Sequence, residues 1–488
     1  MHGFRSSPAQ ERRANGSTGD SPATKARAGE QTTAASGATT HDAGIGPTAT
    51  LAIAGVEFGW GSAGKLSAVL AALGERRSRP LRLIGLGSGL GRPLLAEHDI
   101  DHWYELPTDP LNGKLGTAIE EVVHAERIDA AVVVLDGPVA IALEALSVPT
   151  VFVDSLPFLW TEGDMADLPL DATVYCAQEC VELPKECVHV LNSVQRLRWV
   201  EAIVGTHVRS TQSRPARNSP FLRALVNLGG LRAPHLDDWT HYPEIVVPAV
   251  LDALAEFGIL EVHVAGNLPA DMAERISQRE SGALRVTAGP LTHNDFLQQL
   301  AACDILLTSP GLTTLLEADS LATPTVCLPP QNLSQIFNGR SYGEAVGAGV
   351  RVEWPASVFS EDQVLAHRSG GEDVALRVIY AGIAAAALPS NARATADIVR
   401  GRVLAALRSA SRKSWGGLAS AVGINGAAQV ADALSEILEP TSLPAAATTE
   451  KAPEHSSPAD PPAEAQSRTS ERNVSPGQPT APERRHIS

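Results

Sequence analysis

Hydrophobic and polar positions form two series in which short apolar runs alternate with longer amphipathic runs. Short runs rich in β-branched residues predict buried strands, and apolar positions three or four residues apart predict helices. The first series predicts strands at 48–56, 81–86, 130–135, 150–154 and 174–177, and helices at 65–77, 115–127 and 139–146. The second predicts strands at 224–228, 261–265, 285–288, 304–308 and 325–328, and helices at 244–257, 294–303 and 313–321, before helical runs near 361–387 and 392–437.

Strands that alternate with helices favour doubly wound parallel sheets. The pattern therefore predicts an α/β protein with two Rossmann-like domains, at 47–215 and 221–439, and a ligand in the cleft between them. The polar, proline-bearing stretch THVRSTQSRPARNSP (206–220) is typical of a linker. Residues 1–46 and 440–488 have no apolar periodicity and are rich in Ser, Thr, Ala and Pro. We expect both tails to be disordered, because they bury too little apolar surface to offset their ordering entropy.

Composition narrows the classes of partner. Charges nearly cancel within each tail, so the formal net charge of −16 belongs to the folded part, which argues against nucleic acid or an anionic membrane as the main partner. The apolar stretch 245–266 is interrupted by three carboxylates, and the N-terminus has no apolar signal region, so we expect no membrane span and no secretion. Five cysteines suit a reducing cytoplasm. Abundant Ala, Arg and Gly with little Lys indicate a high-GC bacterial genome.

The stretch ILLTSPGLTTLLEA (305–318) carries the clearest candidate chemistry. A strand here would deliver Ser309 and Gly311 to the carboxyl edge of the sheet, and the following helix would present free N–H groups and the positive end of its dipole. Thr313 and Thr314 add hydroxyl donors, and Glu317, one turn further, can accept two hydroxyls of a ribose. A phosphate followed by a diol describes a nucleotide. The alternative is an ordinary strand–turn–helix with a threonine cap and a solvated glutamate.

SPGLTTLLEA together with TPTVCLPPQNLSQIFN (323–338) resembles the donor-site signature of GT-B glycosyltransferases, in the branch of the peptidoglycan lipid-intermediate N-acetylglucosaminyltransferase. The resemblance implies that Gly311 to Thr314 hold the diphosphate of a UDP-sugar and that Glu317 binds the ribose. It implies that Gln331, Gln335 and Asn338 contact the sugar. It further implies that Gly229 and Gly230, in VNLGG, approach the diphosphate from the opposite side. The implied partners are a nucleotide-sugar donor and a small-molecule acceptor, with no further cofactor and no metal.

The loop EFGWGSAGK (57–65) departs from this family, in which many members carry Gly-His. Here Ser62 and Ala63 stand where the histidine would be. The loop still has Gly59, Gly61 and Gly64. If it is functional, its backbone N–H groups bind a phosphate of the acceptor or the donor, and Lys65 supplies a positive charge. The alternative is that the glycines only form a tight strand-to-helix turn. A dinucleotide site is disfavoured, since no ribose-binding acid follows the second strand.

EFGWGSAGKL and LIGLGSGLGRPLL (83–95) are also similar to cytosylglucuronate synthases and their relatives in actinomycete nucleoside antibiotic biosynthesis. This resemblance implies inverting transfer of glucuronate from UDP-glucuronate to N1 of cytosine. Candidate catalytic bases are Glu57 and Asp154. Lys65, Arg92 or Arg340 could pair with the glucuronate carboxylate.

Three further features leave alternatives open. Cys176, Cys180 and Cys187, with His189 nearby, could bind zinc, but their spacing favours plain buried or surface cysteines. Phe158 or Trp160 could stack a planar acceptor or simply pack in the core, and His293 is expected in a helix cap. At the level of function, the alternatives are a GT-B-fold nucleotide-sugar epimerase and a catalytically impaired nucleotide-sugar-binding protein.

Overall fold

The computed structural model describes residues 48–439, apart from 78–79, 88, 108–113, 206–220, 231, 233–235, 237 and 280–281. The predicted disordered tails, residues 1–46 and 440–488, lie outside the described residues. The predicted linker, 206–220, also lies outside them.

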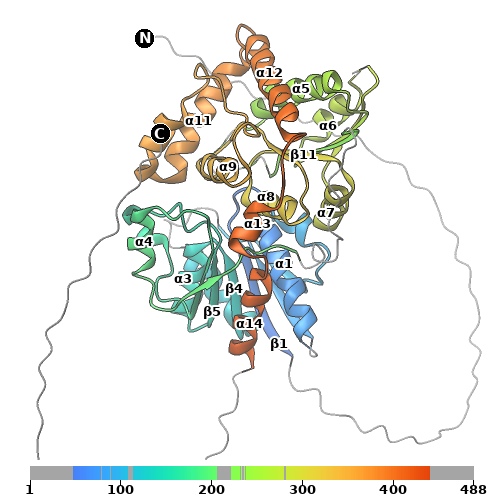
Figure 1. The fold of residues 1–488 in the computed structure, drawn as a ribbon. Coiled ribbons are helices and arrows are strands. Elements are labelled where there is room, and N and C mark those ends of the chain that lie inside the picture. The colour runs from blue at the N-terminus through green and yellow to red at the C-terminus, as the bar shows by residue number, and fades with distance from the viewer. Residues whose placement is uncertain are drawn as a thin grey trace, which may run out of the picture. The chain divides into compact units, whose positions relative to one another are not determined.

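The first sheet, within the described residues, has seven parallel strands in the order β3-β2-β1-β4-β5-β6-β7 (Figure 1). The strands are β1 (Ala49–Gly55), β2 (Leu81–Leu86), β3 (His102–Tyr104), β4 (Ala130–Val134), β5 (Thr150–Asp154), β6 (Val174–Gln178) and β7 (Leu197–Val200). Its helical elements are α1 (Gly61–Arg76), η1 (Arg92–Leu95), α2 (Lys114–Glu126), α3 (Gly137–Ala145), η3 (Glu162–Asp167) and α4 (Lys185–Leu191). Because side chains alternate along a strand, Leu51 and Ile53 pack with α1, and Ala52 and Ala54 pack with α2 and α3.

The second sheet, in the part of the chain that the structure describes, has five parallel strands in the order β10-β9-β8-β11-β12. They are β8 (Arg223–Asn227), β9 (Glu261–Ala265), β10 (Arg285–Gly289), β11 (Ile305–Thr308) and β12 (Thr325–Cys327). The helices that follow or separate them are α5 (His241–Phe257), α6 (Ala270–Ser277), α7 (His293–Ala302), α8 (Leu312–Ser320), α9 (Leu333–Val346), α10 (Glu361–Ala366), η5 (Arg368–Gly370), α11 (Gly371–Ala387) and α12 (Ala392–Ala410). The core of this half joins α5, α11 and α12 to one face of the sheet.

Both sheets follow the same winding rule. Each starts at an inner strand, β1 or β8, extends to one side, and then returns to build the other side from β4 or β11. This is the Rossmann order, and it places a switch point between β1 and β4 and another between β8 and β11. The prediction of two Rossmann-like α/β domains is therefore confirmed.

The C-terminal helical run is broken into separate helices. After α12 come α13 (Gly417–Val422) and α14 (Gly426–Leu438), with Gly416 and Gly423 between them at φ 101° and 68°. These left-handed turns redirect the chain, and α14 packs against α1 and the first sheet (Figure 1). The domain limits 47–215 and 221–439 stay predictions, to which the structure adds that the last helix joins the core of the first half.

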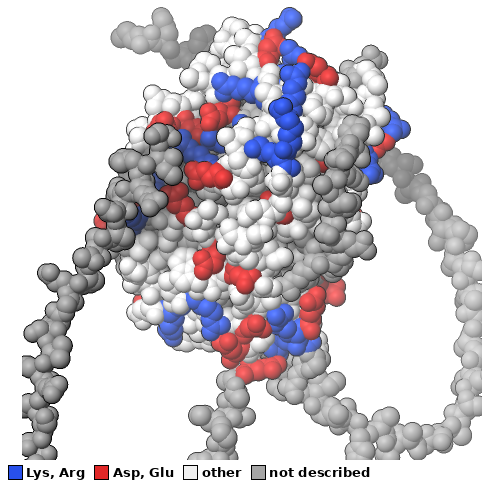
Figure 2. Space-filling model, viewed as in Figure 1, with Lys and Arg blue, Asp and Glu red and all other residues white. Residues whose placement is uncertain are grey.

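The visible face carries charges of both signs. Figure 2 shows basic side chains gathered towards the top of the view, where α12 lies, with acidic side chains beside them. On α12, Arg400 forms an ion pair with Glu256 at 2.7 Å, and Arg402 donates to the backbone carbonyl of Trp354. Among the described residues, no single helix is long and apolar enough to cross a membrane, although the bent pair 368–387 and 392–410 passes by length and composition when taken together.

Candidate functional site

The first switch point lies at the loop from β1 to α1. Ser62 Oγ donates to the carbonyl of Val56 at 2.7 Å and so holds the loop against the first helical turn. Gly59 adopts φ 63°, a left-handed conformation that favours glycine. No side chain caps the N-terminus of α1, so its first backbone N–H groups point towards the cleft without a side-chain acceptor.

The second switch point is organised by Asn227, the last residue of β8. Its amide donates to Thr314 Oγ1 at 3.1 Å, and its Oδ1 accepts from the backbone N–H of Gly229. Asn227 thus fixes both the Gly-Gly turn and the start of α8. Gly311 is the N-cap of α8 and makes no side-chain cap bond, so the helix N-terminus is as open as that of α1.

The two switch points touch. A Cβ added to Gly230 would lie 2.5 Å from the backbone N of Trp60, so only glycine allows this approach. The N–H of Gly59 donates to the carbonyl of Arg232 at 3.1 Å, and Thr313 Oγ1 donates to the carbonyl of Gly61 at 3.3 Å. The N-termini of α1 and α8 therefore face one another, and two positive dipole ends meet at one place. Such an arrangement suits an anion with several oxygens.

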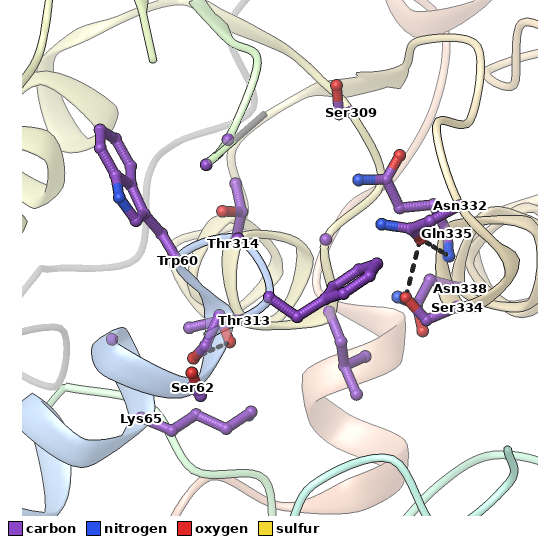
Figure 3. Close-up of a pocket in the computed structure, with 18 of the residues that line it drawn as sticks. Trp60, Ser62, Lys65, Ser309, Thr313, Thr314, Asn332, Ser334, Gln335 and Asn338 are labelled. Atoms are coloured by element: carbon purple, nitrogen blue, oxygen red, sulfur yellow. Dashed lines mark hydrogen bonds between the residues drawn. The ribbon is translucent and has the colours of Figure 1, made fainter. Parts of the chain in front are cut away.

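A cavity of about 320 Å³ opens between these loops (Figure 3). Its volume is in the range of small-molecule sites. The predicted residues that line it are Gly59, Gly61, Ser62, Lys65, Gly229, Gly230, Ser309, Gly311, Thr313, Thr314, Glu317, Gln331, Gln335 and Asn338. In Figure 3, Ser62 and Lys65 come from α1, and Thr313 and Thr314 from the neighbouring first turn of α8. Gly64 and Trp160, also considered from the sequence, line the cavity too. These sequence-based candidates thus line one cavity from both domains, although their roles stay predictions.

Glu317 lies on the wall one turn into α8 and is buried. Its Oε1 is 2.7 Å from Nε2 of His293, itself only 7% exposed. Burial opposes the charged form of His293, but the charge and hydrogen bond of Glu317, with a further contribution from Glu97, raise the pKa of the histidine. The His293 ring therefore occupies one oxygen of Glu317, and the carboxyl group has further acceptor positions for the hydroxyls of a ligand.

Lys65 is also buried, with 1% of its surface exposed. Its Nζ donates to Gln178 Oε1 at 2.6 Å and to the carbonyl of Ile203 at 3.3 Å. Burial lowers the pKa of Lys65 to about 7, with Glu317 acting in the opposite direction. Lys65 therefore contributes a titratable amine next to the anion-binding helix ends.

The amide side chains that line the cavity are hydrogen-bonded to one another and to neighbouring protein groups. Gln331 Nε2 donates to Ser309 Oγ at 2.6 Å and to the carbonyl of Leu228 at 3.1 Å. Gln335 Oε1 accepts from the backbone N–H of Gln331 at 2.9 Å. Asn338 donates to the carbonyl of Pro310, while its buried Oδ1 has no partner among the residues that the structure describes. Gln331 therefore braces the wall, and Asn338 offers an acceptor to a ligand.

The predicted bases do not line the cavity. Glu57 Oε1 accepts from the backbone N–H of Gly89 at 2.9 Å and so holds the loop after β2. Asp154 accepts from Trp160 Nε1, Tyr175 OH and the N–H of Leu156 at 2.7–3.0 Å, and burial raises its pKa to about 6. Both carboxylates are engaged in holding loops, and their catalytic roles remain untested predictions.

Two arginines predicted to meet a sugar carboxylate also lie off the cavity wall. Arg340 pairs with Glu361 at 3.2 Å and Asp362 at 2.8 Å, and Arg92 stacks over the ring of Trp103. Arg232, which the sequence interpretation did not single out, does line the cavity.

The three clustered cysteines are free in the described structure. Burial raises the pKa of Cys176 and of Cys180 to about 12, so neither favours the thiolate that zinc requires. Cys187 Sγ lies 2.9 Å from a nitrogen of Arg368. Among the described residues, no three His, Cys, Asp or Glu side chains gather as they would around a metal ion.

Several lining residues were missed by the sequence interpretation. They are Trp60, Asn227, Arg232, Asn332, Ser334 and Glu372, while His293 was expected only in a helix cap. Asn227 had a readable signal, since it ends a strand directly before a Gly-Gly turn. Glu372 had none, because its carboxylate reaches the backbone N–H of Leu333 from a helix distant in sequence.

Two Rossmann-like domains with a ligand-sized cavity at their facing switch points define the GT-B class of fold. No family model matches the sequence, and no curated protein matches it either.

Solved structures similar to this chain include MurG of Acinetobacter baumannii, at 12% identity and a TM-score of 0.44, with 80% of this chain and 100% of that chain covered. Another is S. aureus MnaA in its co-structure with UDP, at 12% identity and a TM-score of 0.47, covering 80% and 97%. A third is Arabidopsis thaliana UGT89C1 complexed with UDP, at 13% identity and a TM-score of 0.46, covering 80% and 99%.

Proposed function

We propose that this protein is a glycosyltransferase that moves a sugar from a UDP-sugar to a small-molecule acceptor. The observation that carries the proposal is the meeting of two open helix N-termini, α1 and α8, beside the buried carboxylate of Glu317. The helix ends suit a diphosphate, and Glu317 suits the ribose diol one helical turn away. A nucleoside diphosphate fits that order of groups.

The donor sugar would extend towards Asn332, Ser334, Gln335 and Asn338 (Figure 3). These side chains carry amide and hydroxyl groups, which pair with sugar hydroxyls. The unpartnered Oδ1 of Asn338 is buried and would gain a hydrogen bond from such a hydroxyl. This side of the cavity is therefore assigned to the donor.

The reaction is a displacement at the anomeric carbon. The acceptor oxygen or nitrogen forms a bond to that carbon as the bond to the diphosphate oxygen breaks, and the electron pair leaves with UDP. The acceptor proton passes to a base or to water. Attack from the face opposite the diphosphate inverts the configuration. We propose that the two helix dipoles stabilise the departing charge, so that the step needs no metal ion.

The narrower hypothesis takes UDP-glucuronate as donor and cytosine as acceptor. Of the cationic side chains first considered for the glucuronate carboxylate, Lys65 lines the cavity, but its Nζ is bonded to Gln178 and to the carbonyl of Ile203. Arg232 also lines the cavity, and we therefore expect Arg232, and not Arg340, to distinguish glucuronate from glucose. UDP release from UDP-glucuronate with cytosine tests this hypothesis directly.

The general proposal is tested by donor binding. Glu317→Ala should weaken UDP binding by about 1–3 kcal/mol, the scale of lost hydrogen bonds to a charged group. Isothermal titration of UDP, with GDP and dTDP for comparison, measures this. The control is Asp319→Ala on the same helix, because Asp319 is equally buried and bonds to the backbone N–H of Gly416 and Ala419 but does not line the cavity.

Three outcomes separate the alternatives. The proposal is supported if Glu317→Ala loses UDP affinity while Asp319→Ala keeps it, and if the wild-type protein releases UDP from a UDP-sugar when an acceptor is present. Tight binding without UDP release under any acceptor would favour a nucleotide-sugar-binding accessory protein. Conversion of the UDP-sugar itself without an acceptor would favour an epimerase. A failure of UDP, GDP and dTDP to bind would remove the basis of the site.

A further inference from the structure

The two sides of the cavity differ in polarity. On the side from the second domain, Asn, Ser, Thr, Gln, Glu, His and Arg side chains outnumber the apolar and aromatic ones, which are Leu228, Ala265, Leu291, Phe296, Leu312, Leu376 and Tyr380. On the side from the first domain, apolar and aromatic residues are the majority: Val56, Phe58, Trp60, Leu94, Leu135, Leu156, Leu159 and Trp160 stand beside Ser62, Lys65, Ser155, Gly59, Gly61 and Gly64. If the donor occupies the polar side, the acceptor meets the apolar one.

Most side-chain polar atoms on the apolar side bond to the protein, and Trp60 Nε1, buried without a partner among the described residues, is an exception. Trp160 Nε1 donates to Asp154 at 2.7 Å, which occupies the polar edge of the indole and leaves its hydrocarbon surface for the cavity. Ser62 Oγ is bound to Val56, and Lys65 Nζ to Gln178 and Ile203. A ligand rich in polar groups would lose its hydration here and gain few hydrogen bonds from these side chains.

Leu135 provides an independent observation. It follows β4 at the switch point and has φ 62°, the left-handed region, where a residue other than glycine is disfavoured by about 1–2 kcal/mol. Its N–H donates to the carbonyl of Val153 at 3.0 Å, which holds the backbone in this state. The protein therefore keeps an apolar side chain on the cavity wall at a position where glycine or asparagine would relieve backbone strain.

We infer that the acceptor is apolar over most of its surface and aromatic, with one nucleophilic hydroxyl or ring nitrogen, and is neither a sugar nor a strongly polar heterocycle. This inference replaces cytosine, the acceptor of the narrower hypothesis above, and keeps the UDP-sugar donor. The inference rests on the proposed transferase function, because that function assigns the polar side to the donor. For a phenol, its oxygen bonds to the anomeric carbon, the phenolic proton is released, and UDP departs with the electron pair of the broken bond.

Binding of a probe to the UDP-loaded protein tests the inference without requiring turnover. The probes are 2-naphthol, cytosine and glucose, each titrated calorimetrically into protein saturated with UDP. We expect 2-naphthol to bind most tightly. Leu135→Asn places a polar amide on the wall in a residue that tolerates this backbone, and should weaken 2-naphthol binding about tenfold while leaving UDP affinity unchanged.

Ser147→Asn is the matched control, because Ser147 has the same φ of 62° but is exposed and outside the cavity. Leu135→Gly is the second variant, since it removes the side chain while relieving the strain, and it should also weaken 2-naphthol binding. Tighter binding of cytosine or glucose, equal effects at positions 135 and 147, or no 2-naphthol binding would overturn the inference. The proposed function fails separately, by the absence of UDP binding.

Discussion

At the scale of single residues, burial decides what each titratable group in the cleft can do. Lys65 shows this most directly, because its amine is enclosed between Gln178 and the carbonyl of Ile203 and keeps a pKa of about 7. His293 and Glu317, also buried, are hydrogen-bonded to each other, and the charge of Glu317 raises the pKa of His293 against the effect of burial. Asp154 and Glu57 have the same chemistry in principle but are bonded to loop atoms. Position therefore matters more than residue type.

Lys65 gives a prediction about pH. The folded-state pKa of about 7 lies below the ordinary lysine value of 10.5, so between these values the unfolded chain binds more protons than the folded chain. The free energy of unfolding of the wild type should therefore rise with pH from 7 to 10 relative to that of Lys65→Met. Urea unfolding of both proteins at pH 7, 8.5 and 10 measures the difference. Lys114→Met, at an exposed lysine, should show no such trend, and a pH-independent difference at Lys65 would contradict the assignment.

At the scale of elements, short segments from the second half hold the loop that carries the acceptor wall. Arg368, in η5, donates to the carbonyl of Phe158 at 2.6 Å and to Glu186 at 2.7 Å. Its guanidinium also lies over the ring of Phe337, 4.9 Å from the centroid. The planar fork of arginine satisfies these contacts together, which a lysine ammonium would not. The loop that ends in Trp160 is therefore held by a distant element.

Arg368→Ala should destabilise the fold by about 1–3 kcal/mol, because it leaves buried acceptors without their charged donor. It should also weaken acceptor binding more than UDP binding, since the residues it contacts support the acceptor side. Urea unfolding and titration of UDP and 2-naphthol measure the two effects. Arg400→Ala removes an exposed ion pair with Glu256 and should cost less than about 1 kcal/mol. If Arg368→Ala weakens UDP binding and 2-naphthol binding equally, Arg368 does not act by positioning the loop on the acceptor side.

At the scale of the whole molecule, the last helix completes the core of the first half. Val430 and Leu434 of α14 are fully buried against residues of α1 and the first sheet. Ion pairs between Arg76 and Asp432 at 2.6 Å and between Arg198 and Glu436 at 2.9 Å flank this contact. The first half thus depends on residues more than two hundred positions away.

A fragment of residues 48–205 should therefore not fold stably by itself, because the surface that α14 covers would be exposed to water. We expect it to bind a hydrophobic dye and to unfold without a cooperative transition. A peptide of residues 424–439 added to the fragment should restore cooperative unfolding, followed by circular dichroism. The same peptide with Val430→Asp and Leu434→Asp serves as the control and should have no effect. A cooperative transition in the fragment alone would show that α14 is dispensable.

Much of the fold could be predicted because the pattern of apolar and polar residues within each main strand or helix reflects which of its side chains are buried. The run 130–135 is apolar throughout and the run 304–308 has an apolar centre at 305–307, and β4 and β11 occupy these runs almost unchanged. The short, partly exposed strands β3 and β7 carry no such signal and were missed. The single run expected at 392–437 proved to be three helices, because its interruptions depend on left-handed glycines whose effect periodicity does not register.

The sequence by itself determined the order of strands and helices, the two Rossmann-like halves and the glycine-rich turns at their switch points, because these features depend on local periodicity and local backbone freedom. Only the tertiary structure decided that His293 meets Glu317, that Glu57 and Asp154 face loops instead of the cavity, and that α14 returns to the first sheet. Each of these depends on contacts between residues far apart in the chain. A local pattern shows that a side chain is buried or exposed, but it does not show which distant atom it meets.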